Sequence, residues 1–144
     1  MRSKPLLCAI GASLALAGCA SFQFPGTGAS PCNQGVCKVT ITVKSCDQTG
    51  ISATPDTVHV PKGAWHIQWD IATPEYGFTA NGIAIPRNVA IPGTARKVFE
   101  DPRRLTATKF QFKDNNEFPG QYKYNIELVQ GGKTCRYDPT ISND

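Results

Sequence analysis

The chain has little of what most active sites are built from. Its 144 residues include two histidines, His59 and His66, and one methionine, Met1. Its cysteines lack paired C-x-x-C spacing and have no histidine near them in sequence, which argues against a zinc site. No Gly-x-Ser-x-Gly elbow or comparable nucleophile context occurs, which argues against a serine hydrolase. No internal repeat and no long 3.6-residue apolar period is present, so repeat and helical architectures are disfavoured.

The chain also has little net charge. After the first 18 residues, 13 Lys or Arg residues face 11 acidic residues, a net charge of +2. This excess is too small to argue for nucleic-acid binding. One stretch is nevertheless basic, and it suggests either a solvated loop face or a surface for an anionic glycan such as peptidoglycan or lipopolysaccharide. Its basic residues are Arg96, Lys97, Arg103, Arg104, Lys109 and Lys113.

The N-terminal segment has the composition of an export signal. Arg2 and Lys4 precede a short apolar run, Leu6 to Leu16, that is too short to span a bilayer as a mature helix. Leu16-Ala17-Gly18-Cys19 resembles the bacterial lipobox at all four positions. The resemblance implies removal of residues 1–18, acylation of Cys19 and attachment to a membrane through several lipid chains. Ala20 after the cysteine implies sorting to the outer membrane of a Gram-negative cell. Ordinary cleavage near Ala17 or Ala20 is the alternative.

Four cysteines remain after Cys8 leaves with the signal and Cys19 takes lipid. They form an even set in an oxidising compartment, so two disulfides are expected: Cys32, Cys37, Cys46 and Cys135. If residues 37–46 form one extended strand, its ends lie about 30 Å apart, too far for a disulfide between them. Of the remaining pairings we favour Cys46–Cys135 with Cys32–Cys37. The first closes a loop of about 90 residues, worth about 4 kcal/mol in the chain-entropy model.

The rest of the chain reads as a tether followed by strands. Residues 19–36 are rich in Gly, Pro, Ser and Ala, which predicts a flexible segment. From Cys37 to residue 144, short alternating runs are separated by Gly, Pro and Asn turns, which predicts one all-β domain, a mixed or antiparallel Greek-key β-sandwich. The clearest runs begin at Val39, Trp65 and Tyr122.

Two segments are similar to cupredoxins. Pro55 to Gly63, running into His66-Ile67-Gln68-Trp69, resembles the second and third cupredoxin strands. Phe118-Pro119-Gly120-Gln121-Tyr122-Lys123-Tyr124 resembles the run that leads into the copper loop. The resemblance spans most of residues 38–130 and implies a cupredoxin-like sandwich; an immunoglobulin-like one is the alternative.

The copper ligands of that family have no counterparts here. Type 1 copper needs two histidines, a cysteine thiolate and usually an axial methionine. The cysteine is expected near Asn125 or Ile126, and the first histidine is expected where Tyr76 and Phe78 stand. No His or Met follows to residue 144. We therefore expect no blue-copper site, no other cofactor and no electron transfer through copper.

Other candidate chemistry is weak. His59 and His66 lie on the polar side of alternating strands, so exposure is expected; with Asp70 or Glu75 they would form at most a surface metal patch. Glu100-Asp101 and the run from Asp114 to Glu117 fall in turn-like segments, where acidic residues serve solubility. Trp65, Trp69, Tyr122 and Tyr124 are expected in the core rather than on a carbohydrate platform. The better candidates for an exposed contact surface are Tyr76, Phe78 and Tyr137.

These features favour a non-enzymatic envelope lipoprotein that binds an envelope protein or a glycan, or has a structural role. A surface metal-handling module using His59 and His66 is one alternative. A hydrolase with an unrecognised site is another.

Overall fold

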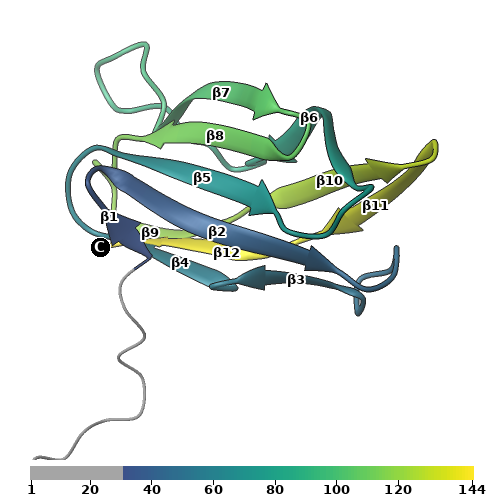
Figure 1. Cartoon of the computed structure of the whole chain (residues 1–144). Coiled ribbons are helices and arrows are strands. Elements are labelled where there is room, and N and C mark those ends of the chain that lie inside the picture. Colours follow the sequence, from purple (N-terminus) through teal and green to yellow (C-terminus); the bar gives the residue numbers. More distant parts are fainter. Residues whose placement is uncertain (1–30) are drawn as a thin grey trace, which may run out of the picture.

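The computed structural model describes residues 31–144 (Figure 1). All regular secondary structure in this range consists of β-strands. The domain is all-β, as expected. The predicted signal peptide 1–18, the lipidation residue Cys19 and the tether as far as residue 30 lie outside the described residues. Residues 31–144 contain no helix of the length and apolarity that crossing a membrane requires.

Alternation of apolar and polar residues creates the strands. In β2 (Val36–Val43) and β5 (Trp65–Ile71), every second side chain is buried and the side chains between them are exposed or half-buried. Side chains of a strand alternate between the two sheet faces, so such a pattern buries one face and leaves the other polar. The strands predicted from Val39 and Trp65 are therefore confirmed.

The largest sheet has six strands and mixed pairing. Its main order is β1-β2-β5-β8-β7, with β3 (Ile51–Thr54) also paired to β2. The remaining members are β1 (Cys32–Asn33), β7 (Phe99–Thr106) and β8 (Lys109–Asp114). β2 and β5 are parallel, whereas the other pairs in this sheet are antiparallel. We call it the main sheet.

Two three-stranded sheets complete the domain. One has the order β11-β10-β6 and the other β4-β12-β9. Their members are β4 (Thr57–Val60), β6 (Gly77–Ala84), β9 (Gly120–Lys123), β10 (Asn125–Gln130), β11 (Lys133–Tyr137) and β12 (Thr140–Asn143).

One hairpin runs through both small sheets. Ile126 pairs with Tyr137 in one sheet, and Tyr122 pairs with Ile141 in the other. The antiparallel register is therefore the same on both sides of the sheet boundary. Between them, the Tyr124 amide donates to the Pro139 carbonyl at 3.2 Å. The run predicted from Tyr122 to Leu128 is thus one extended segment divided into β9 and β10 at Tyr124.

The core lies between the main sheet and the two small sheets. Trp69 of β5 packs against Tyr124 with ring centroids 5.3 Å apart, and Phe99 of β7 packs against Tyr122 of β9 at 4.9 Å. Phe78 of β6 meets Phe110 of β8 at 5.6 Å. The last two pairs are edge-on, and such aromatic pairs add about 0.5–1.5 kcal/mol each beyond area burial. Trp69, Tyr122 and Tyr124 are core residues as predicted, and Trp65 is half-buried.

Phe78 corrects the predicted contact surface. It was expected to be exposed, but it is completely buried. It pairs with Leu128 across β6 and β10, and Gly82 lies so close that a Cβ there would sit 2.6 Å from the Phe78 Cβ. Tyr76 and Tyr137 are half-buried.

Both expected disulfides are present. Cys32 is bonded to Cys37, and Cys46 to Cys135, with a sequence separation of 89 in the second pair. The first disulfide also shifts the domain boundary. β1 pairs with β2, so the folded domain includes Cys32 and the last residues of the range 19–36 that was expected to be tether. The reason is local: Gln34 and Gly35 have positive φ, which closes a tight turn between the two strands.

Candidate functional site

The outward face of the main sheet carries polar side chains in transverse rows. In the central row, Lys38 is paired with Gln68, Gln68 with Gln111, and Gln111 with Arg103. Residues paired across neighbouring strands point to the same side, about 4.8 Å apart, so this row extends about 14 Å. We call this surface the outer face.

Two further rows flank the central one. One contains His66, Lys113 and Glu100, and the other contains Thr40, Asp70, Lys109 and Thr106. Asp70 accepts hydrogen bonds from the Gln68 amide at 3.0 and 3.2 Å and forms an ion pair with Lys109 at 3.0 Å. Four basic residues and two acidic ones stand in the three rows, before any charge on His66. The outer face is therefore polar and net positive.

Positive charge is concentrated in the part of the chain that builds this side. Residues 86–113 contain seven Lys or Arg residues and two acidic ones, whereas the rest of 31–144 contains six basic and nine acidic residues. Residues 86–113 thus carry a net charge of +5 and the rest of the range −3, although the total is small. A local excess of one sign favours encounter with a partner of the opposite charge.

Ion pairs neutralise part of the basic stretch. Arg96 meets Glu100 at 3.6 Å and Glu117 at 3.2 Å, and Arg103 meets Asp101 at 3.7 Å. Exposed pairs of this kind contribute little to stability, so their basic partners are readily redirected to a ligand. Among the described residues, Lys38 forms no ion pair.

The loop between β6 and β7 adds basic residues beside the outer face, and its base is fixed. The Asn88 side chain donates to the Phe99 carbonyl at 2.7 Å and accepts from the Phe99 amide at 3.0 Å, as a paired strand would. Ile91 is buried and anchors the middle of the loop. A cleft of about 400 Å³ lies between this loop and β7, with Lys97 and Glu100 among its lining residues.

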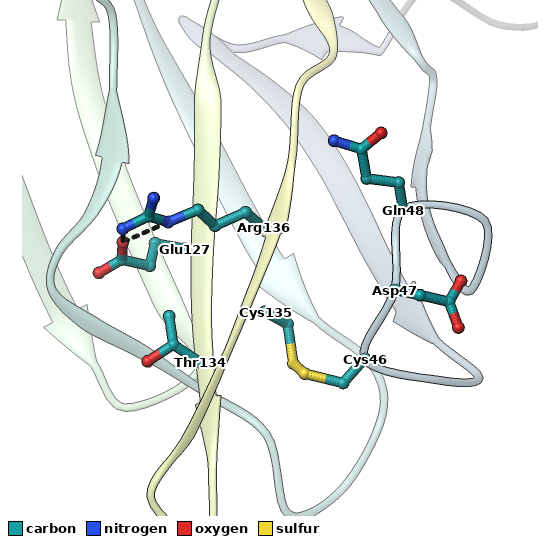
Figure 2. A pocket seen from close by; sticks show the side chains of 7 residues that line it. All are labelled: Cys46, Asp47, Gln48, Glu127, Thr134, Cys135 and Arg136. Carbon is teal, nitrogen blue, oxygen red and sulfur yellow. Dashed lines mark hydrogen bonds and ion pairs between the residues drawn. A yellow bond between two sulfur atoms is a disulfide. The ribbon is translucent and has the colours of Figure 1, made fainter.

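A second cleft, of about 490 Å³, lies beside the Cys46–Cys135 disulfide (Figure 2). Its polar centre is Glu127 on β10. One Glu127 oxygen accepts from the Thr79 hydroxyl at 3.0 Å, and the other is bound by Arg136 at 2.9 and 3.0 Å. Both carboxylate oxygens are therefore occupied.

Asp47 in the same cleft stabilises its own loop. Hydrogen bonds from Ser45, Thr49 and the Gly50 amide lower the pKa of the Asp47 carboxyl to about 2. In Figure 2 its carboxylate points away from Glu127 and Arg136. The geometry indicates a turn-forming residue that stays ionised.

Buried polar side chains gather at the end of β8. Asp114, Asn115, Asn116 and Asn143 are at most 5% exposed. Asp114 Oδ1 accepts from the Asn116 amide at 2.8 Å and from Asn143 Nδ2 at 3.2 Å. Burial is the main cause that raises the pKa of the Asp114 carboxyl to about 6, against the lowering effect of these two hydrogen bonds. We call Asp114, Asn116 and Asn143 the Asp114 cluster.

This cluster corrects the view of Asp114 as an acid in a solvated turn. Asp114 ends a strand whose inward positions are Phe110 and Phe112, so the alternation carries it into the interior. In the sequence, the only sign of this burial is that Asp114 lies two residues after Phe112, and an aspartate at that position is equally typical of the start of a turn. Glu117 is exposed, as expected.

The two histidines lie on different sheets. His59 is on β4 and His66 is on β5, and both are exposed as expected. Of the proposed third ligands, Asp70 is paired with Lys109, and Glu75 accepts from Gln130 at 3.2 Å. Within residues 31–144, no group of three His, Cys, Asp or Glu side chains is placed to hold a metal ion.

Two of the positions where the cupredoxin resemblance would place copper ligands hold buried apolar side chains. Phe78 and Ile126 are completely buried in the core. Asn125, the other position expected for the cysteine, is exposed at the edge of a small polar cleft with Glu127 and Arg136. Neither Asn125 nor the two apolar residues can supply a thiolate or an imidazole.

Comparison with known proteins adds no assignment. No family model matches the chain, and no curated protein matches it.

Proposed function

We propose that this chain is a non-enzymatic, lipid-anchored protein of the bacterial cell envelope whose β-domain binds an anionic glycan through the outer face of the main sheet. The observation that carries the proposal is the set of three in-register rows with Lys38, Gln68, Gln111 and Arg103 at the centre. Cations at both ends of a row with amides between them suit a polymer that presents carboxylates or phosphates beside hydroxyl and amide groups.

The fold type belongs to the same proposal: a cupredoxin-like sandwich without copper. Immunoglobulin-type sandwiches consist of antiparallel sheets. Here β2 is parallel to β5, and β12 is parallel to β4. The segment from β3 to β4 also passes from the main sheet to a small sheet, with a cis bond at Thr54-Pro55 between the two strands. These parallel pairs support the cupredoxin-like alternative.

The envelope location is supported by two independent features of the chain. Leu16-Ala17-Gly18-Cys19 resembles a lipobox, and both disulfides are of the kind that persists in oxidising compartments. Lipid on Cys19 would hold the domain at a membrane, with the segment up to Cys32 as its tether. We propose the outer membrane as the site.

A non-enzymatic role is supported by the state of the polar groups. Glu127 has both carboxylate oxygens occupied, and Asp47 is held ionised by its own turn. The exposed imidazoles lie on separate sheets. No nucleophile and base are paired among these groups.

Glycan binding is tested by cosedimentation of the protein with purified peptidoglycan sacculi and, separately, by binding to lipopolysaccharide micelles. We expect binding to one of them that weakens as salt is raised. The double variant Lys38→Gln/Arg103→Gln should weaken that binding at least about tenfold, because it removes both cations of the central row.

The matched control is Lys123→Gln/Lys133→Gln, which removes the same charge from exposed positions on β9 and β11. It should bind nearly as well as the wild type. Equal weakening in both double variants would show that net charge alone attracts the glycan, and no binding to either glycan would overturn the proposal.

The anchor is tested separately. Cys19→Ala should move the protein from the membrane to the soluble fraction and abolish the acyl mass. A wild-type protein without an acyl mass, together with unchanged membrane partitioning of Cys19→Ala, would refute the lipid anchor and leave the glycan proposal intact.

A further inference from the structure

We propose that the Asp114 cluster is a binding site for a hard divalent cation of the calcium class. The inference is independent of the glycan proposal. It starts from the chemistry of the atoms that have no partner: each of the three side chains has a buried oxygen that receives no hydrogen bond. These atoms are Asp114 Oδ2, Asn116 Oδ1 and Asn143 Oδ1.

The orientation of the amides is fixed by what their nitrogens bind. Asn116 Nδ2 donates to the Val60 carbonyl at 2.9 Å and to the Pro61 carbonyl at 2.7 Å. Asn143 Nδ2 donates to Asp114 Oδ1 at 3.2 Å. Rotating either amide to exchange oxygen and nitrogen would lose these bonds. The unpartnered amide atoms are therefore oxygens, which can only accept a hydrogen bond or bind a cation.

Two hydrogen bonds join the cluster at Asp114 Oδ1. One comes from the Asn116 backbone amide and the other from the Asn143 side chain, which is far from Asp114 in sequence. Asn143 Nδ2 is bonded to Asp114 Oδ1, and the unpartnered Asn143 Oδ1 and Asp114 Oδ2 are the second polar atoms of the same amide and carboxylate. A carboxylate and two amide carbonyls are ligands that Ca²⁺ accepts, with waters completing its six to eight oxygens.

The charge around the cluster favours a cation. Within residues 31–144, Asp114 forms no ion pair, and a buried carboxylate without a counter-charge is costly. Exposed Asp144 follows Asn143 directly in the sequence and adds negative charge near the site, whereas Glu117, which follows Asn116, is paired with Arg96. With one carboxylate, the affinity belongs to the weak range of extracellular modules, about 10⁻⁴–10⁻³ M.

The experiment measures thermal unfolding of the full chain, first freed of metal with a chelator. Addition of 10 mM CaCl₂, against NaCl at matched ionic strength, should raise the Tm by about 5 °C, because a ligand that binds only the folded state stabilises it. Tb³⁺ should bind the same site and show luminescence sensitised by nearby Tyr122, and excess Ca²⁺ should quench it.

Two variants locate the effect. Asp114→Asn keeps the shape and removes the only charged ligand, so the Ca²⁺ shift should fall below about 1 °C; Asp138→Asn removes an exposed charge elsewhere and should behave as the wild type. If Asp114→Asn does not fold, Asn143→Ser provides the second test, with weakened Tb³⁺ luminescence expected.

Three results would overturn the site. One is a wild-type Tm that Ca²⁺ leaves unchanged together with no sensitised Tb³⁺ signal, which would assign the free oxygens to buried water or to a proton on Asp114. The second is a Ca²⁺ shift of equal size in Asp114→Asn, which would place the cation elsewhere. The third, should Asp114→Asn not fold, is Tb³⁺ luminescence as strong in Asn143→Ser as in the wild type.

Discussion

Two polar regions of this domain, the cleft around Glu127 and the Asp114 cluster, differ in how their carboxylates are exposed and bonded. Beside the Cys46–Cys135 disulfide, the Glu127 carboxylate is partly exposed and both its oxygens are bonded, while its partner Arg136 is 74% exposed. In the Asp114 cluster, the carboxylate is completely buried, and one of its oxygens has no partner.

The means of holding the chain together also differ. The Glu127 region is joined covalently to the 44–50 loop through Cys46–Cys135. The Asp114 cluster is held by asparagine side chains that bond backbone carbonyls of other segments. In Figure 1 the turn between β10 and β11 lies at one end of the domain, and β12 ends at the opposite end, near the C mark. The contrast is that the Glu127 carboxylate has both oxygens bonded and is open to water, whereas the Asp114 cluster contains buried oxygens without a hydrogen-bond partner.

The largest expected effect concerns the covalent link. Cys46→Ala/Cys135→Ala should lower the free energy of unfolding by about 4 kcal/mol, because the disulfide closes the longer loop. Cys32→Ala/Cys37→Ala should cost about 2 kcal/mol, since only five residues separate its cysteines. Urea unfolding under non-reducing conditions measures both. Equal losses would contradict the loop-length argument.

The next effect concerns the buried asparagine. Asn116→Ala should cost about 3 kcal/mol, because it leaves the Val60 and Pro61 carbonyls without their donor and places alanine at a positive φ of 40°. Asn116→Gly relieves the backbone and keeps the hydrogen-bond loss, so it separates the two causes in chemical denaturation. A loss below about 1 kcal/mol in both variants would show that water replaces the amide freely.

The third prediction uses the raised pKa of Asp114, in chelator. Because the folded-state pKa is about 6 against an ordinary value of 3.8, the folded state binds its proton more tightly than the unfolded state. Stability from this group is full below pH 3.8 and is lost as the pH rises through 6, by about 2–3 kcal/mol. Asp114→Asn should remove this decline. Urea midpoints at pH 4 and pH 7 measure it, and a wild type with the same decline as the variant would contradict it.

The smallest effect belongs to the exposed pair. Arg136→Ala should change the free energy of unfolding by at most about 1 kcal/mol, because the arginine is solvated and Glu127 keeps its bond from Thr79. The same denaturation assay serves. A loss as large as that of Asn116→Ala would erase the contrast between the two ends.

Much of the fold could be predicted because alternation is local. The runs at Val39 and Trp65 identify buried faces without knowledge of their partners. The even set of cysteines favours the observed pairing if Cys37 begins a strand, although that strand ends at Val43 and does not reach Cys46. The weaker strands could not be found in this way. β7 continues through Asp101–Thr106, whose side chains are all exposed, so no apolar period marks it.

The outer face, too, could be predicted only in part from the sequence. The basic composition of the stretch from Arg96 to Lys113 is visible in the sequence. Its alignment with Lys38 and Gln68 is not, because it depends on the parallel pairing of β2 with β5.

The sequence by itself determined that alternate side chains turn inward, that the strands are short and that four cysteines form two crosslinks, since each of these follows from neighbouring residues or from parity. Only the tertiary structure decided that Phe78 is core and that Asp114 lies buried among asparagines. These depend on contacts between segments distant in the chain, where burial removes water that no local pattern records.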